Sequence, residues 1–166
     1  MKEDLRIRCR ETKKIKISPD ELQEIKTIIQ NDSGKVPVIT ETPYGKDVFF
    51  QGDIGSEIYL KRDSRYLIIS TISLRNQRVG QGTLILNILK DYGAKKGFEG
   101  IMVECANTYE SWSFCNKHNF KPDYFSDLMS KQRTSHFQGN HVLRFDGIYD
   151  ELCFDPTIEL PWPSSN

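Results

Sequence analysis

The chain has 166 residues, of which 37% are hydrophobic, and this length suits one domain with a single core. Lys plus Arg and Asp plus Glu number 23 each, so the formal net charge is zero and no overall field attracts nucleic acid or a membrane surface. No apolar run approaches the ~20 residues that span a bilayer, and the charged start Met1–Arg6 is unlike a secretory signal. We therefore expect a single cytoplasmic domain over residues 1–166, with no membrane partner.

The sulfur and imidazole side chains give no metal-binding pattern. Cys9, Cys105, Cys115 and Cys153 lack the C-x-x-C spacing of zinc sites, and the three histidines lack metal-ligand spacing. We expect free thiols and no bound metal.

The first third of the chain alternates short elements with turn signals. Apolar residues and arginines alternate over residues 5–10, which predicts a strand with a basic face. Ser18-Pro19-Asp20-Glu21 predicts a helix start with Ser18 as N-cap and Glu21 closing a capping box, and the helix ends at Asn31–Gly34. Short strands are predicted at Val36–Ile39, Asp47–Gln51 and Glu57–Lys61.

The middle of the chain predicts a strand, a glycine turn, a helix and a second strand. Tyr66–Leu74 is uncharged and rich in β-branched residues, as in a central strand covered on both faces. Gln77–Gly82 is the turn, Thr83–Lys96 the helix and Gly100–Cys105 the second strand. A right-handed crossover would make the two strands parallel neighbours.

The last third predicts a helix, a late strand and an irregular tail. The helix runs from about Thr108 to His118, and Asn119 suits a left-handed cap. The strand covers His141–Phe145, and the tail begins at about residue 147.

The turn Gln77–Gly82 predicts a site for phosphate or pyrophosphate. Its glycines allow a ligand to approach closely, and the free N–H groups and dipole of the next helix attract an anion. A dinucleotide fold is one alternative, because Glu104 lies at a ribose-binding distance along the chain, but Ile85 occupies the third glycine position. A triphosphate loop is excluded because no Gly-Lys-Ser/Thr follows.

The pattern Gln77-x-x-Gly80-x-Gly82 after a hydrophobic strand resembles the acyl-CoA signature of the GNAT N-acetyltransferases. A second motif of that superfamily is similar to Asn107, Ser111, Phe114-Cys115 and Asn119-Phe120, and the resemblance covers roughly Tyr66 to Pro122. It implies an α/β (α+β) fold: a mixed, mostly antiparallel central sheet with a parallel, splayed central strand pair and flanking helices.

The same resemblance implies that acetyl-CoA is bound as acyl donor, with pyrophosphate on the turn and pantetheine along the first of the two parallel strands. The residues it implies for this binding are Ile72, Ser73, Leu74, Gln77, Arg78, Val79, Gly80, Gln81, Gly82, Thr83, Asn107 and Phe114.

The catalytic groups depart from the superfamily's pattern. Where relatives place a tyrosine acid after the phenylalanine, this chain has Cys115, which is a candidate thiol acid or a small buried hydrophobe. Many relatives carry a glutamate base on the central strand, but Thr71 and Ser73 stand here, and Glu104 is the nearest carboxylate in sequence. Its alternative role is a solvent-facing strand end.

Three functions follow as hypotheses. The first is an N-acetyltransferase in which a primary amine attacks acetyl-CoA directly in a ternary complex. The second is a catalytically weak acyl-CoA-binding module, which Cys115 and the missing glutamate favour. The third is a toxin-like acetyltransferase that acts on an RNA-borne amino group. It is suggested by the basic residues near the start of the chain: Arg6, Arg8, Arg10, Lys13, Lys14 and Lys16. The acceptor and the oligomeric state stay open.

Overall fold

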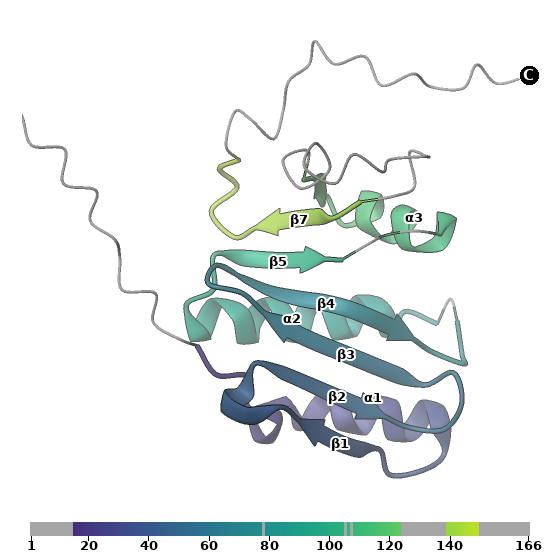
Figure 1. Ribbon diagram of the computed structural model, residues 1–166. Coiled ribbons are helices and arrows are strands. Elements are labelled where there is room, and N and C mark those ends of the chain that lie inside the picture. The colour runs from purple at the N-terminus through teal and green to yellow at the C-terminus, as the bar shows by residue number, and fades with distance from the viewer. Residues whose placement is uncertain (1–14, 78, 105, 107, 124–138, 150–166) are drawn as a thin grey trace, which may run out of the picture.

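The computed structural model of the protein describes residues 15–77, 79–104, 106, 108–123 and 139–149 (Figure 1). Its strands are β1 (Val38–Glu41), β2 (Asp47–Gln51), β3 (Glu57–Arg62), β4 (Tyr66–Ser73), β5 (Gly100–Val103), β6 (Lys121–Pro122) and β7 (His141–Arg144). Its helices are η1 (Pro19–Leu22), α1 (Gln23–Ser33), η2 (Pro43–Gly45), α2 (Gln81–Lys96) and α3 (Tyr109–Lys117), where η marks a 3₁₀ turn.

The seven strands form one sheet in the order β1-β2-β3-β4-β5-β7-β6. Every neighbouring pair is antiparallel except β4 and β5, which are parallel and are joined through α2. The predicted fold class is therefore confirmed: a mixed, mostly antiparallel sheet with one parallel pair at its centre, flanked by helices.

The helices α1 and α2 lie together behind one face of the sheet, while α3 lies beyond β5 near β7 (Figure 1). The core forms where the apolar stripes of α1 and α2 meet the sheet. Ile25 and Ile29 of α1 and Leu89 of α2 are fully buried, as are Phe50 and Leu60 on the facing strands. Burial of apolar area at about 25 cal/mol per Å² holds these layers together.

Ser18 is the N-cap residue of the first turn, as predicted, but the predicted capping box is wrong. Ser18 makes no side-chain cap bond, and its N–H donates to the Tyr92 hydroxyl at 2.9 Å instead. Glu21 pairs with Lys96 across the helix layer rather than closing a capping box. The first turn is 3₁₀, and the α-helix begins at Gln23.

Several predicted strand bounds shift by one or two residues. The strand predicted at Val36–Ile39 lies at Val38–Glu41, because Pro37 has no N–H to donate and the ladder with β2 begins at Val38. The second of the parallel strands ends at Val103, two residues before Cys105.

The end of the chain is described only in part. Asn119 has the expected left-handed φ, at 62°. The strand β6 was not predicted, because two residues carry no periodic pattern. The basic strand expected over residues 5–10 and the tail beyond Tyr149 lie outside the described residues. None of the described helices is long and apolar enough to cross a membrane.

Candidate functional site

The two central parallel strands separate toward their carboxyl ends. They pair from Tyr66 with Gly100 to Ile69 with Val103, and a last hydrogen bond joins Glu104 N–H to the Ile69 carbonyl at 3.0 Å. Beyond this point β4 continues to Ser73, and among the strands that the structure describes it pairs only with β3. The edge of β4 over residues 70–73 is thus exposed to an opening in the sheet. Tyr66, Leu67 and Ile69 are buried but residues 70–73 are only half-buried, so the prediction that this strand is covered on both faces holds only for its first half.

The register of β4 against β3 shifts where the opening begins. Tyr59 pairs with Thr71 and Leu60 with Ile69, so Ser70 is the extra residue of a β-bulge. A bulge leaves its extra residue outside the regular ladder and bends the strand. The bulge therefore leaves Ser70 without a direct partner on β3 at the mouth of the opening.

The helix α2 begins at the far end of this exposed edge. Its N-cap is Gly80, with φ of 82°, a left-handed conformation that glycine adopts without strain. Gly80 has no side chain with which to cap the helix, and the first internal hydrogen bond runs from Leu84 N–H to the Gly80 carbonyl. The N–H groups of the first turn have no partner within the helix, so this end offers donors and a positive dipole to an anion.

The wall opposite β4 is formed by α3, whose first turn is capped by Thr108 accepting the Ser111 N–H at 3.1 Å. The two helices meet at Gly82, where an added Cβ would lie 3.4 Å from Cε2 of Phe114. His118 reinforces this junction: its Nε2 lies 3.2 Å from the Thr83 hydroxyl, and its ring lies 4.6 Å from that of Phe114. A Cβ at Gly82 would thus be in ordinary van der Waals contact with Phe114, and a longer side chain would press on the ring.

These elements enclose a cleft of about 930 Å³. Its lining comes from the second half of β4, the following turn, the start of α2, the end of β5 and one face of α3. From Ser70 to Leu74 the strand extends roughly 13 Å at ~3.3 Å per residue. The cleft therefore joins an anion-binding helix end to a polar end at Glu104 by way of an exposed strand edge.

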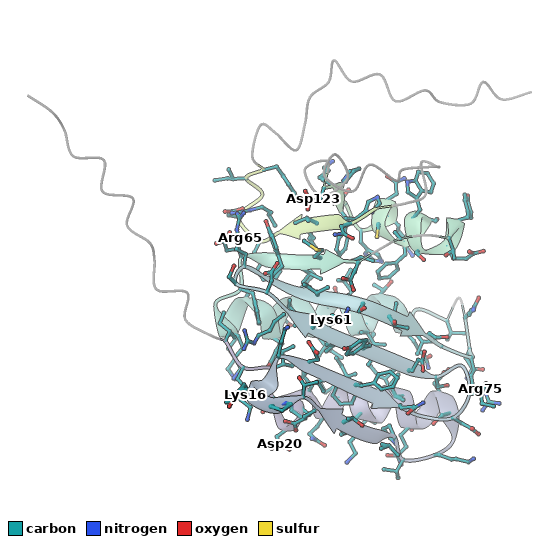
Figure 2. The ribbon with its side chains drawn as sticks, viewed as in Figure 1. Lys16, Asp20, Lys61, Arg65, Arg75 and Asp123 are labelled. Atoms are coloured by element: carbon teal, nitrogen blue, oxygen red, sulfur yellow. The ribbon has the colours of Figure 1, made fainter. Side chains whose placement is uncertain are left out.

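Glu104 is a well-bonded carboxylate at the polar end of the cleft. Its Oε2 accepts from Lys61 Nζ at 2.9 Å and from the Ser70 hydroxyl at 2.7 Å. Burial raises the pKa of Glu104, but the hydrogen bonds from Lys61 and Ser70 outweigh it and leave the pKa below its usual value. Lys61 projects from the middle of the sheet (Figure 2). The carboxylate is thus ionised at neutral pH and is not a free strand end.

Cys115 lies on the other side of α3 from the cleft. Its side chain is fully buried in the main core, and it is absent from the cleft lining. Burial raises the pKa of the thiol to about 12. These properties favour the interpretation of Cys115 as a small buried hydrophobe, and its catalytic role stays a prediction.

The structure brings most of the predicted coenzyme residues together. Those that line the cleft are Ile72, Ser73, Leu74, Gln77, Gly80, Gln81, Gly82, Thr83 and Phe114. Val79 is exposed and does not line it, and Arg78 and Asn107 lie outside the described residues. Cys105 also lies outside them.

Part of the lining was not predicted. Ser70 and Thr71 come from the bulged segment of β4, while Glu110, Ser113 and Lys117 come from α3. Helical spacing of polar residues on α3 was the available signal, but it fits a solvent-facing surface equally well. Among the residues that the structure describes, no three His, Cys, Asp or Glu side chains are grouped to hold a metal ion.

Comparison with known proteins gives limited information. No protein-family model matches the chain, and no curated protein is similar to it in sequence. Among solved structures, N-acetylglutamate synthase from Neisseria gonorrhoeae, complexed with coenzyme A and N-acetyl-glutamate, is similar over 78% of this chain at 16% identity and a TM-score of 0.41. The chain spans about a third of that structure, since the match covers 34% of it. At this identity and TM-score, the similarity gives no information about the activity of this protein.

Proposed function

We propose that the protein is an acetyl-CoA-dependent N-acetyltransferase of the GNAT type, which transfers the acetyl group to a primary amine. The observation that supports this most is the cleft between β4 and β5. It combines the exposed strand edge of residues 70–73 with the uncapped amino end of α2. An extended amide-containing arm that ends in a pyrophosphate is complementary to both features.

The binding roles follow from the elements that line the cleft. The first-turn N–H groups of α2, at Gln81, Gly82 and Thr83, would hold the pyrophosphate. The edge of β4 at residues 72–74 would pair with the pantetheine amides as an added strand does. Gln81 contributes a buried side-chain oxygen without a hydrogen-bond partner in the structure, which suits an N–H of the ligand.

The transfer would follow direct attack. The neutral amine nitrogen forms a bond to the thioester carbonyl carbon, the carbon–sulfur bond breaks, and the sulfur leaves as a thiolate. The amine gives up one proton, and the thiolate takes one. A backbone N–H at the bulged segment of β4 would polarise the carbonyl oxygen as charge develops on it.

Glu104 would take the amine's proton, directly or through a water. Its carboxylate is ionised at neutral pH and lies beside Ser70, where the strands part. Its lowered pKa makes Glu104 a weak base, which would not deprotonate an ammonium ion efficiently. The acceptor amine would therefore bind largely in its neutral form. Cys115 has no comparable position, because its buried thiol faces the core.

A catalytically weak acyl-CoA-binding module is the second candidate. It is favoured by Cys115, which replaces the expected acid and is fully buried with a raised pKa. The same cleft would then bind the coenzyme without efficient turnover. We also propose that the protein is cytoplasmic and that its acceptor is a primary amine.

Two measurements on the same protein separate the candidates. Binding of coenzyme A is measured by titration calorimetry, and release of free thiol from acetyl-CoA is measured over a panel of small amines and amino-terminal peptides. Amine-dependent thiol release supports the transferase. Binding without release on any acceptor supports the module, and failure to bind coenzyme A contradicts both.

A matched variant assigns any binding to this cleft. Gly82→Leu would press its side chain onto Phe114, because even a Cβ at this position lies 3.4 Å from the ring. We expect it to lose coenzyme A binding. Lys95→Leu, on the last turn of the same helix and away from the cleft lining, is the control that should bind like the wild type.

A further inference from the structure

Asp32 is a buried carboxylate whose partners lie far away in sequence. It belongs to the last turn of α1, and the residue is only 6% exposed. Its Oδ2 accepts from the Ser56 hydroxyl at 2.5 Å and from Arg75 N–H at 2.7 Å. Its Oδ1 accepts from the backbone N–H and the side-chain amide of Asn76, both at 2.9 Å. Four donors thus compensate the burial of one charge.

The helix that carries Asp32 does not favour it. The carboxyl end of a helix is the negative end of its dipole, so an anion in the last turn of α1 is disfavoured there. Burial also raises the pKa of Asp32, and only the hydrogen bonds from Ser56, Asn76 and Arg75 bring the pKa below its usual value. The position of this carboxylate is therefore explained by its donors and not by its own helix.

Two of these donor residues begin the turn after β4. Arg75 and Asn76 are exposed, directly precede Gln77 and are held by a carboxylate on another element. Arg75 adds a bond from its guanidinium to the Ser33 carbonyl at 3.4 Å. Figure 2 shows Arg75 at the end of the sheet where the chain leaves β4. The two residues that lead into the glycine turn are thus tied to α1.

We propose that Asp32 is a positioning residue for the coenzyme-binding turn: by fixing Arg75 and Asn76, it holds the start of that turn at Gln77 in place, so that the amino end of α2 is ready for the pyrophosphate. The inference rests on the proposed function, because it names that ligand. A turn that is ordered before binding avoids the entropy of ordering it when the ligand arrives. Loss of the carboxylate should therefore weaken binding of the anionic end of the coenzyme alone.

The first test compares two Asp→Asn variants by titration calorimetry with coenzyme A. Asp32→Asn keeps the size of the side chain but offers one acceptor oxygen and an amide that opposes the remaining donors. We expect its dissociation constant to rise about 10-fold, an order-of-magnitude value for a lost charge-assisted network. The control is Asp63→Asn, which removes a carboxylate that accepts the N–H groups of Arg65 and Tyr66 at the other end of β4.

A second ligand separates positioning from general damage. Pantetheine, which lacks the pyrophosphate, is titrated by chemical-shift changes against the same variants. We expect Asp32→Asn to bind pantetheine like the wild type, and Asp63→Asn to bind both ligands like the wild type. Equal weakening for both ligands, or no weakening for coenzyme A, would overturn the proposal.

Hydrogen–deuterium exchange tests the same residue without any ligand. Asp32→Asn should speed amide exchange over residues 75–82 and leave that of α2 beyond Leu84 unchanged. Unchanged exchange over the turn would overturn the positioning role. If the wild type fails to bind coenzyme A, the proposed function is contradicted, and the exchange result alone decides whether Asp32 orders the turn.

A milder variant covers the case in which Asp32→Asn does not fold. Asn76→Ala removes only the side-chain donor to Oδ1 and lies on an exposed residue. We expect a rise in the dissociation constant of about 2- to 3-fold for coenzyme A, as for the loss of one hydrogen bond, and none for pantetheine. No change for coenzyme A would count against the proposal.

Discussion

At the scale of single residues, Cys115 decides between two interpretations of the sequence. Its thiol is fully buried in the core, and its pKa is raised to about 12. If it only packs, Cys115→Ala costs roughly 1 kcal/mol of stability, and Cys115→Ser costs roughly 1–3 kcal/mol because its hydroxyl is buried without a partner. Urea unfolding measures both, and we expect the Ala variant to keep any amine-dependent thiol release within about 2-fold.

The contrary result is equally clear. If Cys115→Ala leaves stability unchanged but lowers the rate of amine-dependent thiol release about 100-fold, the hypothesis that Cys115 is the general acid is supported. General acid–base groups contribute about 10²–10⁴-fold to a rate. The native thiol should also resist alkylation at pH 8, because the thiolate is the reactive form and little of it is present.

Glu104 and Lys61 give a pH-dependent contribution to stability. The folded-state pKa of Glu104 is lowered, so its contribution is present above about pH 4.3, the ordinary glutamate value, and is lost as pH falls through the folded-state pKa. Both side chains are about a third exposed, which limits the pair to roughly 0.5–1 kcal/mol. We expect Glu104→Gln to lower the free energy of unfolding by this amount at pH 7 and by nearly nothing at pH 3.

A double-mutant cycle with Lys61→Gln isolates that pair in the same denaturant titrations. The control is the more exposed pair of Lys35 and Asp53, whose Asp53→Asn variant should lose less at pH 7. An effect of Glu104→Gln that is equal at pH 3 and pH 7 would show that packing, and not charge, accounts for it.

At the scale of elements, the junction of β4 and α2 depends on one backbone conformation. Gly80 has φ of 82° with nothing within 4 Å of an added Cβ, so Gly80→Ala introduces strain without a clash. An alanine in this region costs roughly 1–2 kcal/mol, whereas asparagine tolerates it better. We expect Gly80→Ala to raise the dissociation constant of coenzyme A about 5- to 10-fold and Gly80→Asn to raise it less, by calorimetry.

The other end of the same helix supplies a matched control. Gly97 has φ of 88°, likewise with open space around an added Cβ, and it lies at the carboxyl end of α2. Gly97→Ala should cost similar stability and leave coenzyme A binding unchanged. Equal loss of binding in both variants would mean that helix stability, and not the conformation of the turn, controls the site.

The local sequence pattern was sufficient to predict most helices and strands, but not the side-chain contacts between them. The crossover from β4 through α2 to β5 followed from hydrophobic runs and glycines, and β2 was predicted with its observed bounds. The contact of Lys61 with Glu104 depends on the registers of the strands β3, β4 and β5. The contact of Asp32 with Asn76 depends on how the end of α1 packs against the chain after β4. Such pairs are properties of tertiary packing, which periodicity does not encode.

At the scale of the whole molecule, the sheet is continuous except at one place. Ladders join every neighbouring pair, but β5 leaves β4 after Ile69, so residues 70–73 form an edge inside the sheet instead of at its border. An internal edge is shielded from other chains yet offers unpaired N–H and C=O groups to a ligand. The opening would thus give the proposed extended ligand a place along β4 within the sheet.

Binding at this internal edge should be visible across the molecule. Coenzyme A at 100 times its dissociation constant would stabilise the fold by about 2.7 kcal/mol and raise Tm by roughly 5–10 °C for a domain of this size. Hydrogen exchange locates the cause: the amides of residues 70–74 and 80–84 should slow strongly on binding, while those of β2, which is already paired on both sides, should change only with global stability. If Tm rises but the slowing is uniform over the sheet, the ligand binds elsewhere than along β4.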